Sequence, residues 1–547
     1  MSNARDVLAR IVDAEGARVV RSWRYADKRT AILELCRAID AIYLETEEDS
    51  ELAEACRQGS SKAILLFVDQ SFNEQRTGLF PSNDETFQWA LSALTYCARL
   101  ATCEKILDYE KAGLCHLDQS DHTMRVEFLP KYGGIEALEV AEFDRTRGML
   151  VDIQQPFHEL LDSDNERITK LVRTLVYRWS DHFIGYGAHP EVDEHFHQRG
   201  LLRVQLMTGQ DAFRDDSNFG GLPFTFYTKV VWTMVGWALK HIEFAKTLSE
   251  CESDLLMQNL ITVTADVNRI SASIASALGC TEEEANQALA LLEMNLDNAR
   301  ESSINGHAPP PLIRTSREQF LRPLAGLLQT PFEFMLRGMK RAYRSDWDRA
   351  VGEREGLFRE ELFKLFPQAW LIKIPTGITL RHARMVLTDI DAVILDLRNG
   401  VAGIFQLKWQ DTFGHSMRER WARMRNFQRE ATEWLEAVHT FLSCSSPEDI
   451  RKVFTVPLRD WRPLKFCFFV IGRNFAHFSG ETLPDSRAAW GVWPQVLRLS
   501  RESKNSSDPI STLHSELVLS SPMNKKVRVE KTTFGLGELI LTMEPIG

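Results

Sequence analysis

The sequence lacks the features that mark several large classes of protein. Its 547 residues include nine cysteines but no Cys-x-x-Cys pair, so a disulfide scaffold and the common structural zinc motifs are both disfavoured. The longest membrane-like run, Val230–Leu239, is too short to span a bilayer. The amino-terminal segment MSNARDVLARIVDAEGARVV is charged and lacks the apolar core of a secretory signal. We therefore predict a reduced, cytoplasmic protein with no membrane partner.

An excess of positive charge is also missing. The net charge is −11, so any contact with nucleic acid has to come from a local basic surface. The histidines between His182 and His197 have no standard zinc spacing, and Asn218-Phe219-Gly220-Gly221 is not followed by the Lys-Ser/Thr of a phosphate loop. We therefore expect the histidines not to form a metal site, and we expect residues 218–221 to form a turn.

The length and the pattern of apolar residues indicate several domains. Helical spacing dominates residues 1–123, which we expect to form a helical domain, and residues 124–344, a mostly helical domain with short β segments such as RVEFL and IEALEV. Residues 345–480 read as helix, strand, hairpin, long helix and apolar strand, which predicts an α/β domain. Residues 481–547 contain two β-like runs, SELVLSS and GELILTM, and are expected to form a β-rich extension.

The most informative segment is a pair of apolar strands, LTDIDAVILDLRNGVAGIFQLKWQ, at residues 387–410. Between the strands lies Asn399-Gly400, which favours a two-residue type I′ turn because both positions tolerate positive φ. Such a turn pairs Arg398 with Val401 and thereby sets the register of the whole hairpin.

This register brings three polar side chains to one face. It places Asp391 opposite Lys408, and Gln406 points the same way because it lies two residues from Lys408. The rest of the hairpin is apolar, so polar groups there cost free energy unless they bind something. A carboxylate and an amide oxygen suit a divalent metal ion, and an ammonium suits a phosphate. The alternative is an ordinary cross-strand ion pair, which strands this apolar disfavour.

An acidic residue entering a strand, followed on the next strand by Gln-x-Lys-Trp, resembles the PD-(D/E)XK nuclease superfamily, and within it the Mrr-like restriction endonuclease branch. The resemblance covers residues 346–475. It implies that Asp391 is the metal-binding Asp, that Gln406 stands where Glu is the usual second ligand, and that Lys408 is the catalytic lysine. It also implies a restriction-endonuclease-like α/β domain with a mixed central sheet, behind a large helical amino-terminal region.

The same resemblance implies a glutamate on the helix before the first strand. The segment DWDRAVGEREGLFREELFKLF offers Glu355, Glu360 and Glu361, and the spacing to its buried stripe ranks Glu355 and Glu361 level. The literal Pro-Asp of the family is absent, and Asp389 is a second candidate for the metal ligand. The hairpin register favours Asp391.

The function implied by the resemblance is a metal-dependent endonuclease, with DNA as the favoured substrate and defence against foreign DNA as the role. Mg²⁺ or Mn²⁺ would be held by Asp391, the Gln406 carbonyl and the main-chain carbonyl of Leu407. Lys408 would orient the attacking water or contact the phosphate. Because Gln carries no charge, an inactive nuclease-fold protein that binds nucleic acid or regulates a partner stays open, as does a helical scaffold.

A basic helix follows the motif. We expect the arginines of its first half to contact the phosphate backbone, and the alternative is a solvated helix with intrahelical pairs. These residues are Arg418, Arg420, Arg423 and Arg425. Trp409 either stacks on a base or packs in the core, and packing is favoured. The helical amino-terminal region offers a surface for self-association or for a partner protein.

Overall fold

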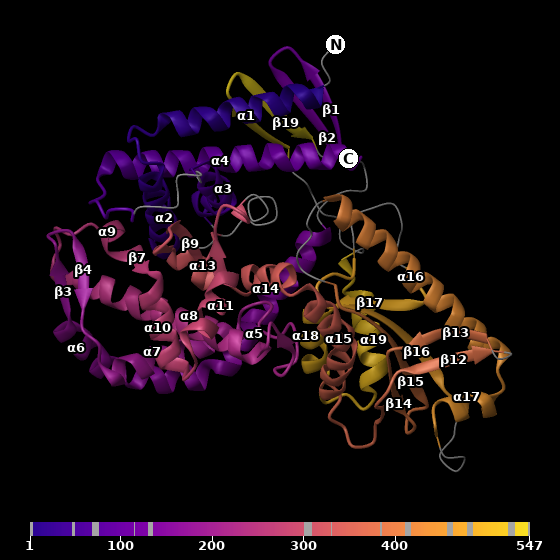
Figure 1. Cartoon of the computed structure of the whole chain (residues 1–547). Helices are drawn as coiled ribbons and strands as arrows, with labels where there is room; N and C mark the ends of the chain where they lie inside the picture. The colour runs from indigo at the N-terminus through magenta and orange to yellow at the C-terminus, as the bar shows by residue number, and fades with distance from the viewer. Residues whose placement is uncertain are drawn as a thin grey trace. The chain divides into compact units, whose positions relative to one another are not determined.

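The chain forms two compact units in the computed structural model, with helices and sheets in both (Figure 1). Unit 1 comprises Met1–Glu127, Ile153–Asp348 and Thr532–Met543, and unit 2 comprises Phe128–Asp152, Arg349–Lys531 and Glu544–Gly547. The structure describes residues 4–45, 50–67, 76–113, 115–128, 135–299, 309–329, 331–382, 385–410, 417–456, 463–477, 485–522 and 531–544. The expected mixed α and β class is therefore present, but the division differs from four successive domains.

Helices make up most of unit 1. They are α1 (Ala4–Ser22), α2 (Lys28–Glu45), α3 (Glu51–Phe67), α4 (Asp84–Lys111), α6 (Asn165–Leu175), α7 (Pro190–Gln205), α8 (Phe224–Cys251), α9 (Met257–Ile261), α10 (Val267–Leu278), α11 (Glu282–Leu292), α13 (Leu324–Gln329) and α14 (Pro331–Ala342). Two longer helices, α5 (Ile135–Ser163) and α15 (Arg344–Lys364), contribute residues to both units. The helical spacing of the amino-terminal segment is thus realised in α1–α4.

Small sheets complete unit 1. One has the order β1-β2-β19-β18, built from Cys115–Ser120, Thr123–Phe128, Leu539–Glu544 and Thr532–Leu536. A second has the order β7-β10-β9-β8, built from Val263–Asp266, Gln319–Arg322, Leu312–Ser316 and Glu293–Met294. Two hairpins are β3 (Val176–Trp179) with β4 (Phe183–Tyr186), and β5 (Asn218–Phe219) with β6 (Leu222–Pro223). The last hairpin contains the turn that Asn218-Phe219-Gly220-Gly221 predicted.

The core of unit 1 is organised around α8, whose buried residues span most of its length. Helix α7 crosses it at two glycines. A Cβ on Gly200 would lie 2.7 Å from the Gly236 main-chain nitrogen, so only glycine lets the two backbones approach this closely. Among the described residues, none of the helices is both long and apolar enough to traverse a bilayer.

A five-stranded mixed sheet forms the centre of unit 2, in the order β11-β14-β15-β16-β17. Its strands are Ile372–Ile374, Ala392–Asp396, Val401–Lys408, Lys465–Gly472 and Ala488–Val492. The first three are antiparallel neighbours, and β15, β16 and β17 run parallel. A hairpin of β12 (Ile378–His382) and β13 (Met385–Ile390) is inserted before β14.

Helices cover both faces of this sheet, as Figure 1 shows. Helices α16 (Met417–Cys444) and α17 (Pro447–Val453) pack on one face, and α15, α18 (Trp493–Glu502) and α19 (Pro509–Leu519) pack on the other. Two separate apolar cores result, which explains why β14 is buried at every residue and β15 at all but the last.

Two β-like runs were misinterpreted from the sequence. SELVLSS lies in α19, where Asp508 caps the helix, Pro509 begins it, and Leu513 and Leu517 form a buried stripe one turn apart. IEALEV opens α5. The predicted β-rich extension therefore divides: β17, α18 and α19 complete unit 2, and β18 and β19 join a sheet of unit 1.

Candidate functional site

The candidate site lies where β14 begins and β15 ends. The pairing register of these two strands differs from the prediction. Asp396 pairs with Val401, so the connecting turn has four residues, Leu397–Gly400, rather than two. Continuing this register beyond Ala392–Phe405 puts Asp391 level with Gln406, not with Lys408. The shift is two residues, so the same side chains still share one face.

The turn is longer because Asp396 organises it. Its Oδ1 accepts hydrogen bonds from the main-chain nitrogens of Arg398 (3.0 Å) and Asn399 (3.1 Å). The Asn399 Nδ2 donates to Asp396 Oδ2 at 2.7 Å, and Gly400 takes a φ of 66°. An aspartate bonded to amides two and three residues ahead is a side-chain-built turn, which outweighed the preference of Asn-Gly for a tighter one.

Asp391 lies between β13 and β14, and its carboxylate points at the backbone of β15. Its Oδ2 accepts from the Leu407 main-chain nitrogen at 2.6 Å, and its own carbonyl accepts from Arg359 Nη1 at 2.9 Å. Burial raises the pKa of Asp391 to about 6, against the opposing effect of that backbone hydrogen bond. Asp389, in contrast, is exposed on β13. The two aspartates thus differ in environment, and the buried position of Asp391 against β15 favours it over Asp389 as the candidate metal ligand.

Gln406 is 7% exposed, and its Oε1 has no hydrogen-bond partner among the described residues. It belongs to the face of β15 that carries Ile404 and packs under α16. A shielded acceptor without a donor is costly, by about 1–3 kcal/mol. Such an oxygen fits a site that receives a cation or a donor from a ligand.

Lys408 shares that face and is a quarter exposed, and its Nζ lies 3.3 Å from Glu430 Oε2 on α16. Lys408 is also close enough to Asp391 to oppose the rise in that carboxyl's pKa. Asp391 and Lys408 of the predicted group are thus within electrostatic reach of each other, and strand parity places Gln406 on the same face as Lys408. Glu430 was not foreseen as a partner, because nothing in its sequence position indicates contact with β15.

The two candidate glutamates of α15 are not equivalent. Glu355 lies within electrostatic reach of Asp391, where it raises that carboxyl's pKa. Glu361 forms an ion pair with Arg473, which follows β16. The helix therefore presents Glu355, not Glu361, to the candidate site.

Trp409 is packed rather than presented for stacking. Its ring contacts Phe358 edge-on at 5.7 Å between centroids, and the guanidiniums of Arg473 and Arg354 lie 4.4 Å and 5.4 Å from its ring centroid. Both arginines are themselves buried. Of the two roles that the sequence left open for Trp409, this arrangement agrees with packing, which was favoured, and not with a place on a nucleic-acid surface.

The predicted basic surface is described only in part. Arg418, Arg420 and Arg423 belong to α16, but their side chains lie outside the described residues. Arg425 is exposed on the same helix. The proposed contact with phosphates stays a prediction.

Oxygen atoms dominate the potential ligands at this site. They come from Asp391, Gln406 and, on α15, Glu355, which is the donor type that Mg²⁺ and Mn²⁺ prefer. Within the described ranges, no cluster of three or more His, Cys, Asp or Glu side chains is arranged to hold a metal ion. Comparison of the chain with protein-family models, with curated proteins and with solved structures finds no match.

Proposed function

We propose that unit 2 is a metal-dependent nuclease that hydrolyses phosphodiester bonds in nucleic acid, with DNA as the favoured substrate. The observation that carries the proposal is the buried Oε1 of Gln406, which has no partner among the described residues. The continued register of β14 and β15 puts Gln406 level with the buried Asp391. A divalent cation would coordinate an oxygen of each residue, and the ammonium of Lys408 on the same face would form an ion pair with a phosphate. A mixed sheet covered by helices on both faces agrees with the domain that the PD-(D/E)XK resemblance implies.

The residues present fit Mg²⁺ or Mn²⁺. Asp391 and Gln406 would hold the ion, Glu355 could approach it from α15, and the Leu407 carbonyl is a further donor on the same strand. Bound there, the ion would lower the pKa of a coordinated water and offset negative charge on the reacting phosphate.

The chain's own groups have separable tasks. Asp391 is held by the Leu407 amide and, through its carbonyl, by Arg359, so its carboxylate is fixed in direction. Lys408 carries a positive charge to the site, and Glu430 positions its ammonium. We place catalysis on Asp391 and Lys408 and treat Glu430 as a positioning residue.

A second function is favoured by one specific residue. Gln406 supplies an amide where a carboxylate would bind a cation more strongly, and this favours a protein that binds nucleic acid without cutting it. Under this alternative, wild-type protein binds DNA with or without metal and produces no cleavage.

The test is a cleavage assay with the purified full-length chain. Supercoiled plasmid, single-stranded DNA and single-stranded RNA are each incubated with Mg²⁺, with Mn²⁺ or with chelator. We expect cleavage that requires metal and that is lost in Asp391→Ala. The matched control is Asp389→Ala, which removes an exposed carboxylate two residues away and should cut like wild type. Equal activity in the two variants would overturn the assignment of Asp391, and no cleavage by wild type would favour the binding function.

A further inference from the structure

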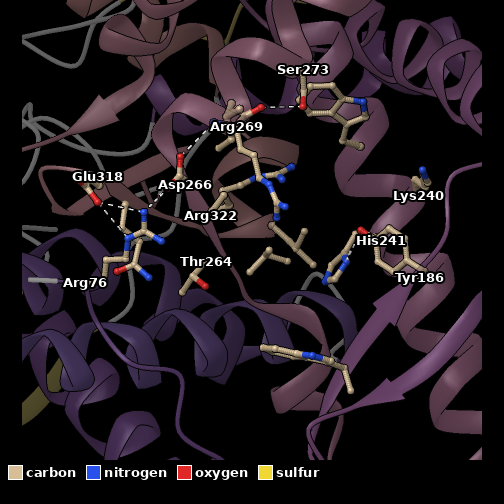
Figure 2. A pocket seen from close by; sticks show the side chains of 17 residues that line it. Arg76, Tyr186, Lys240, His241, Thr264, Asp266, Arg269, Ser273, Glu318 and Arg322 are labelled. Atoms are coloured by element: carbon tan, nitrogen blue, oxygen red, sulfur yellow. Dashed lines mark hydrogen bonds and ion pairs between the residues drawn. The ribbon is translucent and has the colours of Figure 1, made fainter.

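A cavity of about 600 Å³ lies within unit 1, far in sequence from the hairpin of the candidate nuclease site (Figure 2). Helices α8 and α10 and strands β7 and β10 contribute its lining. This volume falls in the range of about 300–1,000 Å³ that is usual for small-molecule sites.

Arg322, the last residue of β10, points into this cavity (Figure 2). Its Nε is shielded from solvent and has no hydrogen-bond partner in the described part of the chain, and no described carboxylate forms an ion pair with it. Its guanidinium lies 5.9 Å from the ring centroid of Trp237. Burial lowers the pKa of Arg322, but a guanidinium stays charged at neutral pH. The residue as a whole is half-buried, but its shielded Nε lacks a partner, and a shielded charged donor without a counter-ion is costly, which calls for an anion.

The other charges of the cavity do not supply that anion. The lining acids, Asp266 and Glu318, both pair with Arg76, at 2.6 Å and 3.1 Å. Asp266 also caps α10 by accepting from the main-chain nitrogens of Asn268 and Arg269, so the start of that helix is already occupied.

Two further cations line the cavity, and they differ in their partners. Lys240 pairs with Asp193, which is not part of the lining, at 2.5 Å. The Arg269 guanidinium makes neither an ion pair nor a hydrogen bond to any described residue, and Figure 2 shows this side chain directed into the cavity. Arg269 and Arg322 therefore leave two positive charges uncompensated within the described chain.

The rest of the lining includes aromatic and hydroxyl-bearing residues beside aliphatic ones. Trp179, Tyr186 and Trp237 provide flat apolar surface, and Thr264 and Ser273 provide hydroxyls. The Tyr186 hydroxyl lies 3.0 Å from His241 Nδ1, and His241 Nε2 lies 2.8 Å from the Leu260 carbonyl. Burial lowers the pKa of His241 to about 4, so this histidine is neutral and fixes Tyr186 rather than adding charge.

We propose that this cavity binds a small phosphate-bearing molecule with an aromatic ring, of the nucleotide class. Arg269 and Arg322 hold its phosphate through forked hydrogen bonds, and the ring lies against the aromatic wall. A partly open cavity of this volume fits a mononucleotide or dinucleotide better than a nucleic-acid strand. The proposal does not depend on nuclease activity in unit 2.

Calorimetric titration of the full chain tests the proposal, in a buffer with chelator so that no metal ion takes part. The probes are ADP, inorganic pyrophosphate, adenosine and a short single-stranded oligodeoxynucleotide. We expect ADP to bind best, pyrophosphate to bind more weakly and adenosine not to bind measurably. Arg322→Gln should weaken ADP binding by about 10- to 100-fold, the range for hydrogen bonds to a charged group. Arg317→Gln is the matched control, because it removes an exposed arginine of the turn between β9 and β10 outside the lining.

Thermal unfolding separates this role from a structural one. If the charge of Arg322 is uncompensated, Arg322→Gln without ligand should leave the melting temperature unchanged or raise it, and ADP should no longer shift it. A lower melting temperature for the ligand-free variant would show that a carboxylate of the chain neutralises Arg322 and would overturn the proposal. Absence of binding by any probe, binding of the oligonucleotide alone, or equal ADP affinity in wild type and Arg322→Gln would overturn it as well.

Discussion

The candidate site of each unit contains, among the several such atoms of that unit, one shielded polar atom that has no partner among the described residues, and the two atoms have opposite character. In unit 2 the atom is Gln406 Oε1, an acceptor, which the continued strand register puts level with the buried Asp391. In unit 1 it is Arg322 Nε, a shielded donor on a half-buried cation. Because each unmet group is costly, each region is suited to a ligand of complementary charge: a cation in unit 2 and an anion in unit 1.

The two regions also differ in how they are built. Three residues of the group in unit 2 come from two neighbouring strands or the position just before one of them, and a fourth, Glu355, comes from the preceding helix. The cavity in unit 1 is assembled from segments as distant as Arg76 and Arg322. A local pattern can therefore reveal the first and cannot reveal the second.

Among the variants that test this difference between the two regions, we expect the largest effect from Lys408→Ala. Removing the only predicted cation of the cleavage site should lower the rate of metal-dependent cleavage by at least about 100-fold, as for other groups that stabilise developing charge. Mn²⁺ affinity should not fall, because Lys408 repels the ion. Lys452→Ala, an exposed lysine on α17, is the control and should cleave like wild type. Cleavage by Lys408→Ala at the wild-type rate would remove this lysine from the mechanism.

Gln406→Glu should change the unit 2 site from a weak to a strong cation site. A second carboxylate beside Asp391 should raise Mn²⁺ affinity by about tenfold, equivalent to about 1.4 kcal/mol. Without metal, two adjacent buried carboxyls repel, so the variant should melt at a lower temperature than wild type and be rescued by Mn²⁺. Gln495→Glu places the same charge at another buried glutamine of unit 2 and should not be rescued. If Mn²⁺ raised the melting temperature of Gln406→Glu no more than that of Gln495→Glu, the result would contradict a cation site.

Charge reversal of Arg418, Arg420 and Arg423 should weaken nucleic-acid binding more modestly. For duplex DNA, each phosphate that an arginine no longer neutralises should flatten the dependence of log affinity on log salt concentration by about 0.9. Binding isotherms at several salt concentrations measure this slope, and Mn²⁺ titration provides the control, which should be unchanged. An unaltered slope would exclude this helix from the binding surface and leave Lys525-Lys526-Val527-Arg528 as the next basic segment to test.

A further prediction concerns stability alone and comes from a buried carboxyl that does have partners. Asp40 accepts from the Ala325 main-chain nitrogen and the Thr262 hydroxyl, both at 2.9 Å, yet burial raises its pKa to about 7. The folded pKa lies above the unfolded value of about 3.9, so its contribution is complete below that value and is lost as the pH rises to about 7.

Denaturant unfolding of wild type and Asp40→Asn measures this loss. Relative to the variant, wild type should lose at most about 1.4 kcal/mol per pH unit between roughly pH 5 and 7, with no further change above that range. A difference that is independent of pH would show that Asp40 is ionised throughout.

Sequence reasoning recovered the elements that have strong local signals. The long helix and the apolar strand that follow the hairpin are α16 and β16. These features depend on residues within one or two turns of each other.

The errors have tertiary or side-chain causes. The hairpin register was wrong by two residues because the Asp396 carboxylate, not the Asn-Gly dipeptide, determines the turn. Glu355 and Glu361 were indistinguishable by spacing, since only the position of Arg473 after β16 shows that Glu361 is already paired. The polar face of Asp391, Gln406 and Lys408 survived the register error because a shift of two residues preserves strand parity.

The most direct test of the contrast between the two regions is Mn²⁺ binding, followed by electron paramagnetic resonance of the free ion. Wild-type chain and Asp391→Ala are titrated without nucleic acid, with Arg322→Gln as a variant of the other region. The contrast predicts one Mn²⁺ site in wild type, the same site in Arg322→Gln, and its loss in Asp391→Ala. Equal Mn²⁺ binding by wild type and Asp391→Ala would contradict it.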